Sequence, residues 1–224
     1  MSIRDVKHSI LRHFPGAIGK KYDTKYFGRR AMPDFHAALE DCRGMTAIDL
    51  GANVGEFTRI MSDKSSKVIA FEPDPWCLDQ LRANTADLTN VEIIAAAAST
   101  ENGEMSLFRH ESFEDDPLNN SQSSSLMSSK SNITLDGAHS VRTVDFLEFL
   151  RGLDSPVGVL KIDIEGAEVD ILEHLFDDDD LGSRVKYIFC ETHEDKIPEH
   201  KARVEALKKR ASRMQSPKAN LYWH

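Results

Sequence analysis

The segment from Asp49 to Gly55 constrains the fold more than any other part of this 224-residue chain. A short apolar run, 45–50, precedes it, and the residues from Gly55 to Met61 begin a helical pattern. Gly51 and Gly55 permit the tight backbone turn between the two. A strand, a glycine turn and a helix start, in this order, open a Rossmann-like βαβ unit.

Glu72 adds a second constraint, because it ends the next apolar run, 67–71. It lies about 20 residues after Gly51, where such folds place a carboxylate on ribose hydroxyls. A dinucleotide would need its pyrophosphate against the loop, usually over three glycines, and here Asp49 lies directly ahead of only two. A carboxylate about 4 Å from a phosphate costs roughly 4 kcal/mol. S-adenosylmethionine carries cations and no phosphate, so the acidic residue favours it.

Strands and helices are predicted to alternate along the rest of the chain. Apolar runs at 157–162 and 185–190 are typical of buried parallel strands, and 91–97 is predicted as a third strand. Helices are predicted from Asp74-Pro75 and over 143–150, 167–176 and 199–210. The sequence therefore predicts an α/β fold, a Rossmann-like doubly wound and mostly parallel sheet with helices on both faces. An extra strand is predicted at 105–108, and the last strand, 219–223, is expected to be antiparallel.

Two segments lie outside this alternation. Residues 1–44 are predicted to be helical and irregular, and either cap the ligand pocket or pack against the sheet edge. Residues 110–132 are polar and rich in serine, which indicates either a lid over the active-site face or a disordered connection.

Several blocks of sequence resemble the FkbM-type methyltransferases, a branch of the class I fold that uses S-adenosylmethionine. The blocks are 48–58, 71–74, 97–103, 160–168 and 191–193. Lys161 to Gly166 is the most family-specific of them. The resemblance implies one methyltransferase domain, 45–224, and acceptors among sugars, glycans or secondary metabolites.

Ligands of open α/β sheets bind beyond the carboxyl ends of the strands, and candidate site residues fall at those ends. The expected cofactor residues are Asp49, Gly51, Asn53, Gly55, Glu72, Ala97 and Asp163. Methyl transfer to a hydroxyl benefits from a base, and His193 is the candidate, oriented by Asp163 or Glu191.

Two alternatives remain open at these positions. Lys161, Asp163 and Glu165 share one side of an extended strand, so Lys161 is either catalytic or part of a structural ion-pair set. Asp163, Glu191 and His193 could instead hold a divalent cation, as in some catechol-type methyltransferases of this fold; no metal is predicted, since two carboxylates and one imidazole on two strands are a weak signal.

The composition points to an acidic cytoplasmic protein. Its net charge of −9 argues against nucleic-acid binding, and no apolar run is long enough for membrane insertion. Cys42, Cys77 and Cys190 lack metal-ligand spacing and are expected to be buried thiols in a reducing compartment. The predicted function is O-methylation of a hydroxyl with S-adenosylmethionine. An NAD-dependent oxidoreductase and a non-catalytic nucleoside-binding domain are the alternatives.

Overall fold

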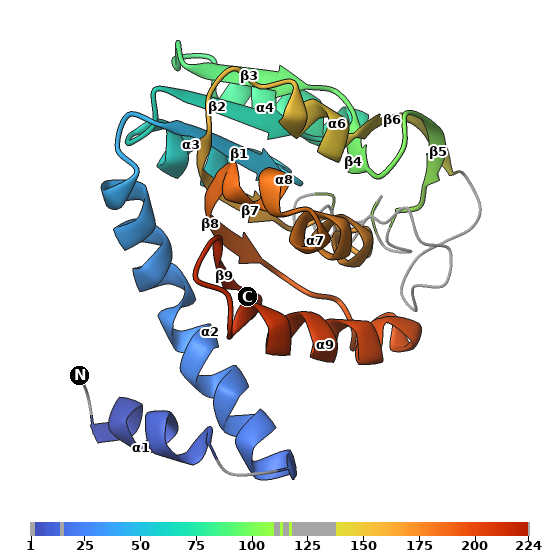
Figure 1. Cartoon of the computed structure of the whole chain (residues 1–224). Coiled ribbons are helices and arrows are strands. Elements are labelled where there is room, and N and C mark those ends of the chain that lie inside the picture. Colours follow the sequence, from blue (N-terminus) through green and yellow to red (C-terminus); the bar gives the residue numbers. More distant parts are fainter. Residues whose placement is uncertain (1–2, 14–15, 110–112, 114–116, 118–137, 224) are drawn as a thin grey trace.

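A six-stranded sheet forms the centre of the computed structural model, which describes residues 3–13, 16–109, 113, 117 and 138–223. Its strand order is β3-β2-β1-β7-β8-β9, and every neighbouring pair is parallel (Figure 1). The strands are β1 (Thr46–Leu50), β2 (Lys67–Phe71), β3 (Val91–Ile94), β7 (Val157–Ile162), β8 (Val185–Cys190) and β9 (Lys218–Asn220). All six residues of β7 are buried, as a central strand covered on both faces requires.

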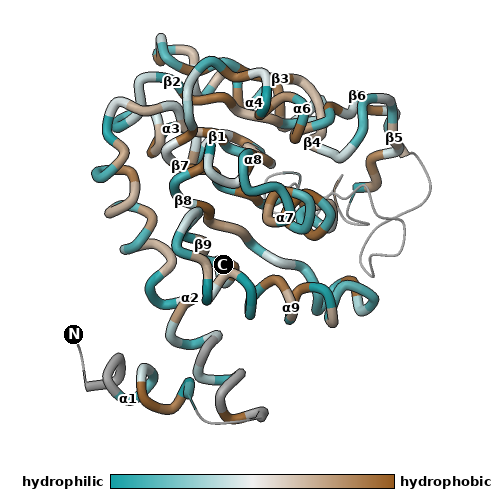
Figure 2. Tube along the Cα trace, in the orientation of Figure 1, coloured by the Kyte–Doolittle hydropathy of each residue, from teal (hydrophilic) through white to brown (hydrophobic). Residues whose placement is uncertain are grey.

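Helices cover both faces of this sheet, which confirms the predicted fold class. One face packs against α2 (Gly16–Asp41), α3 (Glu56–Ser62) and α4 (Pro75–Asn84). The other packs against α6 (Phe146–Arg151), α7 (Glu168–Asp177), α8 (Asp179–Ser183) and α9 (Lys201–Ala211). Hydrophobic and hydrophilic stretches alternate along α7 in Figure 2, as expected for a helix with one side on a core.

The last strand runs parallel to its neighbour, so the expected antiparallel strand over 219–223 is wrong. β9 pairs with β8 in the register Tyr187 to Lys218 and Ile188 to Ala219. The short 3₁₀ turn Pro198–His200 and helix α9 carry the chain back along the sheet. A strand that follows such a crossover re-enters in the original direction and pairs in parallel.

The predicted strand 91–97 is divided between two sheets. β3 ends at Ile94, and β4 (Ala97–Ser99) joins a second sheet of order β4-β6-β5 with β6 (His139–Asp145) and β5 (Gly103–Leu107). Strand β6 was not predicted, because 143–150 reads as one helix. That helix, α6, starts only after Asp145, whose carboxylate caps it by accepting from the amides of Leu147 and Glu148.

The N-terminal segment is more helical than predicted. Helix α1 (Ile3–Leu11) packs against α2, and α2 continues through Pro33 as one long helix. Phe35 and Trp223 meet edge to face beneath the sheet, so this part of α2 packs on the sheet. The segment 110–132, predicted to be either a lid or a disordered connection, lies outside the described residues apart from positions 113 and 117. None of the helices described here combines the length and hydrophobicity needed to cross a membrane.

Candidate active site

Strand register brings the predicted site residues to one edge of the sheet. Leu50 pairs with Ile162, which in turn pairs with Cys190, so these three strands end level. The amide of Asp163 donates to the Leu50 carbonyl at 3.0 Å, and the amide of Glu191 donates to the Ile162 carbonyl at 3.0 Å. The residues that follow the strands therefore meet beside the glycine loop.

The loop after β1 adopts the backbone conformation for which its glycines are needed. Gly51, Asn53 and Gly55 have φ values of 77°, 50° and 93°, all in the left-handed region. A side chain on Gly51 would overlap the carbonyl oxygen of Asp163. Gly51 is thus required where the loop meets the end of β7.

Glu72 is buried at the end of β2 and holds the same loop. One carboxylate oxygen accepts from the Asn53 amide at 2.8 Å, and the other accepts from the Asp74 amide at 2.8 Å. Burial raises the pKa of Glu72 to about 7, although these two hydrogen bonds oppose the shift. Each oxygen can accept a second hydrogen bond, so the carboxylate keeps capacity for ribose hydroxyls.

Asp49 and Lys161 form a buried ion pair beneath the loop. The Lys161 ammonium lies 3.1 Å from the Asp49 carboxylate and donates to the Gly51 carbonyl at 2.9 Å. Thr58 donates to the other Asp49 oxygen at 2.7 Å, and Asp49 is fully buried. Burial alone would lower the pKa of Lys161, but Asp49 and Asp163 raise it. Lys161 is therefore part of a structural ion pair, and Lys161 and Thr58 each engage one oxygen of Asp49.

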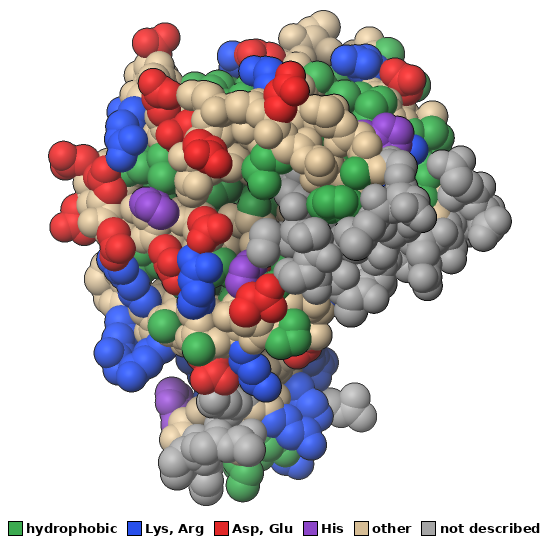
Figure 3. Space-filling model, turned by 90° about the vertical axis from the view of Figure 1, so that its right-hand side faces the viewer, with side chains coloured by type: hydrophobic (Ala, Val, Ile, Leu, Met, Phe, Trp, Pro, Cys, Tyr) green, Lys and Arg blue, Asp and Glu red, His purple; other side chains and the backbone are tan. Residues whose placement is uncertain are grey.

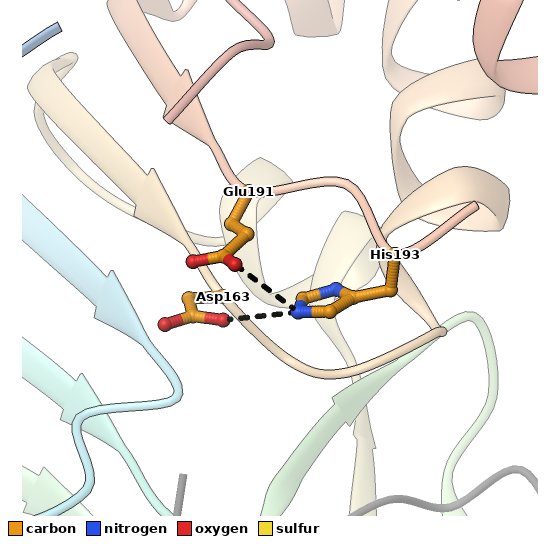
Figure 4. Close-up of side chains that lie close together, drawn as sticks. All are labelled: Asp163, Glu191 and His193. Atoms are coloured by element: carbon orange, nitrogen blue, oxygen red, sulfur yellow. Dashed lines mark ion pairs between the residues drawn. The ribbon is translucent and has the colours of Figure 1, made fainter. Parts of the chain in front are cut away.

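His193 lies among carboxylates at the ends of β7 and β8 (Figure 4). Its Nε2 atom is 3.7 Å from Asp163 and 3.8 Å from Glu191, and both carboxylates point toward it. Nδ1 is 3.2 Å from Glu168, which also accepts the His193 backbone amide at 3.1 Å. The structure thus brings together the three predicted catalytic residues.

The carboxylates and the imidazole alter one another's pKa. Burial opposes the charge of His193, but the hydrogen bond to Glu168 and the surrounding carboxylates raise its pKa above the ordinary value. Burial, and then the charge of Asp163, raises the pKa of Glu191 to about 7. Burial also raises the pKa of Asp163. Asp163, Glu191 and His193 therefore share their protons, and gain or loss of a proton by one changes the pKa of the other two.

Glu168 and Lys196 were given no role from the sequence, and Glu165, expected on an extended strand beside Lys161, lies beyond the end of β7 and pairs with Lys196 instead. Glu168 is buried against His193, and Lys196 pairs with Glu165 at 3.2 Å. Glu165 has a φ of 54°, which is rare for a residue with a side chain. The sequence signal for Glu168 is its place in the first turn of a helix that directly follows a strand end. Ala97, expected near adenine, starts β4 and is buried.

Comparison with protein families identifies the chain. The family model described as the methyltransferase FkbM domain matches residues 49–214. The chain belongs to the FkbM methyltransferase family. It is accordingly a methyltransferase domain with S-adenosylmethionine as its cofactor. No match was found among curated proteins.

This FkbM methyltransferase also has distant likenesses among solved structures. An FkbM methyltransferase from Methylobacillus flagellatus shares 15% identity and a TM-score of 0.39, over 78% of this chain and 45% of that one. An rRNA methylase from Streptococcus thermophilus shares 12% identity and a TM-score of 0.38, over 66% of this chain and 64% of that one. The chain thus spans less than two thirds of either protein, and its own acceptor does not follow from them.

The residues at the strand ends fit S-adenosylmethionine. Positive φ angles at Gly51, Asn53 and Gly55 let the loop backbone approach a ligand closely. Glu72 offers a hydrogen-bond acceptor for a ribose, beside that loop. This FkbM methyltransferase therefore has a hydrogen-bond acceptor, Glu72, beside a loop whose backbone a ligand can approach. These features suit a nucleoside that carries an amino-acid part.

Proposed function

We propose that this methyltransferase transfers the methyl group to a hydroxyl oxygen of a sugar, glycan or secondary metabolite. The observation that carries the proposal is the convergence of Asp163, Glu191 and His193, with His193 Nε2 within 3.8 Å of both carboxylates. Together they form a polar group able to take a hydroxyl proton. The loop that would hold the cofactor contacts the same Asp163.

Each part of the site has a separate task in this reaction. When bound, S-adenosylmethionine supplies a methyl group on a sulfonium, and its sulfur takes up the electron pair of the C–S bond as the acceptor oxygen forms the new O–C bond. Gly51, Asn53 and Glu72 would hold the cofactor in place, and alignment of donor and acceptor can supply roughly 7 to 11 kcal/mol. The proton of the hydroxyl passes to the group around His193, which contributes a factor of about 10² to 10⁴.

Charge supports a small or carbohydrate acceptor over a nucleic acid. The chain has 28 basic and 37 acidic residues, whereas nucleic-acid binding depends on contacts between cations and phosphates. Side chains of both signs share the face shown in Figure 3. Cys42, Cys77 and Cys190 are buried and form no disulfide, which favours a reducing compartment, and we place the enzyme in the cytoplasm.

The test is a screen of cell extracts with S-adenosylmethionine labelled in its methyl group. The wild-type chain should give a labelled product whose methyl group is on oxygen, and His193→Ala should lower turnover about 10² to 10⁴-fold without loss of cofactor affinity. A product methylated on nitrogen or carbon would contradict the proposal. Binding of the cofactor with no transfer to any extract component would favour the non-catalytic alternative. Family membership already favours methyl transfer over NAD-dependent oxidation.

A further inference from the structure

In the part of the chain that the structure describes, one polar atom beside the ends of β7 and β8, Nε2 of His193, is buried without the hydrogen bond that such an atom normally makes. The neighbouring Asp163 and Glu191 side chains, by contrast, are 28% and 29% exposed. Nε2 of His193 makes no hydrogen bond with the described residues, although a Glu165 oxygen lies 3.2 Å away, and this side chain is 2% exposed. Asp163 and Glu191, at 3.7 and 3.8 Å from Nε2, accept no side-chain hydrogen bond from the residues that the structure describes. All three side chains come from neighbouring strand ends and face one another (Figure 4).

We propose that Asp163, Glu191 and His193 bind a divalent transition-metal cation. One ligand atom of each residue lies within 4.8 Å of the others. Ligands that share an ion at about 2.1 Å lie roughly 3 to 4.2 Å apart, so small side-chain rotations complete the site. Two carboxylates with one imidazole suit an ion such as Mn²⁺ better than Mg²⁺ or Ca²⁺, which take oxygen ligands.

Glu168 prepares His193 for this role. Its carboxylate lies 3.2 Å from Nδ1 and also accepts the amides of His193 and Gly166. A carboxylate at Nδ1 keeps the proton on that nitrogen, which leaves the lone pair of Nε2 on the side of the ring that faces Asp163, Glu191 and Glu165. Histidine ligands of metals commonly have such a carboxylate partner, which fixes the ring and increases its basicity. Glu168 is thus a positioning residue.

The distribution of charge favours a cation at the same place. Glu165, at 3.2 Å from Nε2, is paired with Lys196 at 3.2 Å. Lys161 lies 3.9 Å from Asp163, and this lysine is already paired with Asp49. Asp163 and Glu191 are therefore the least compensated carboxylates of the group. This inference rests on the proposed function and changes one step of it. The ion would have open positions for an acceptor hydroxyl and would lower its pKa. The hydroxyl proton would then leave to water, because the lone pair of His193 Nε2 would be on the ion.

The test is the affinity of the full chain for Mn²⁺ alone, measured by titration calorimetry and by electron paramagnetic resonance. Glu191→Gln should weaken binding at least about tenfold, and Glu168→Gln about 10 to 100-fold. Glu194→Gln is the matched control, because Glu194 adjoins His193 in sequence but pairs with Lys208 at 2.6 Å. It removes the same charge and should leave affinity within about twofold. Thermal unfolding verifies each fold, and Asp163→Asn replaces Glu191→Gln should the latter not fold.

A wild-type chain that binds Mn²⁺ no more tightly than Glu191→Gln would overturn the metal site. So would methyl transfer that continues at its full rate in excess chelator, and in that case the proposed function would stand. A second combination of results is that the wild type binds Mn²⁺ tightly, that Glu191→Gln loses this binding, and that the product is methylated elsewhere than on oxygen. The metal site would then be supported and the hydroxyl acceptor would be wrong.

Discussion

Lys161 and Asp49 form a buried ion pair, and Lys161 also donates a hydrogen bond to the loop after β1. Their carboxylate and ammonium are 3.1 Å apart, and both side chains are buried. Removal of either one would leave a buried charge without its partner, which commonly costs 3 to 5 kcal/mol. Their position at the strand ends predicted contact with a ligand, and in the structure they contact each other, the Thr58 hydroxyl and the Gly51 carbonyl.

Glu72 should make stability depend on pH. The folded chain holds its pKa near 7, above the ordinary value of 4.5, so the folded state binds this proton more tightly than the unfolded state does. The stabilisation is complete below pH 4.5 and is lost as the pH rises through 7. Urea unfolding of the wild type should show a larger loss of free energy between pH 5 and 8 than unfolding of Glu72→Gln.

The exposed Glu92, which pairs with Lys67 on the neighbouring strand, provides the control for that measurement. Glu92→Gln removes the same charge and should follow the wild-type profile. Parallel profiles for Glu72→Gln and the wild type would mean that Glu72 titrates near its ordinary pKa.

The loop after β1 provides a prediction at the level of a single element. Gly51 and Gly55 both have positive φ, and alanine in that region costs about 1 to 2 kcal/mol. Added atoms at Gly55 meet the flexible end of Leu81, whereas at Gly51 they meet the backbone of Asp163. Gly51→Ala should therefore lower the free energy of urea unfolding clearly more than Gly55→Ala. Equal losses would show that backbone conformation alone explains both glycines.

The site residues that could be predicted from the sequence are those that directly follow a strand. Glu72, Asp163, Glu191 and His193 each come within three residues of a strand end, so the order of parallel strands is enough to bring them together. Glu168 could not be placed this way, and for Glu165, which is also three residues past a strand, the strand order alone does not give the direction of its side chain. They reach His193 through the turn after β7, where Glu165 has a φ of 54°, and no local pattern of side chains predicts that conformation.

At the scale of the whole molecule, the sequence prediction was wrong about the direction of strand β9 and about the existence and pairing of strand β6. The direction of β9 depends on how far α9 carries the chain across the sheet, which is decided by packing of Val204 and Leu207 on the core. Strand β6 pairs with β4 and β5, both remote in sequence, so its own residues give little signal. The central sheet was predictable because β1, β7 and β8 each consist mostly of apolar residues.

Calorimetric titration of the full chain with S-adenosylhomocysteine and with NAD, at pH 8, tests the identity of the cofactor site most directly. We expect micromolar binding of S-adenosylhomocysteine, no measurable binding of NAD, and a loss of 1.5 to 3 kcal/mol of binding free energy in Glu72→Gln, about the usual worth of hydrogen bonds to a charged group. Glu92→Gln should bind like the wild type. Tighter binding of NAD, or an unchanged affinity in a folded Glu72→Gln, would contradict a cofactor site built on the Gly51 loop and Glu72.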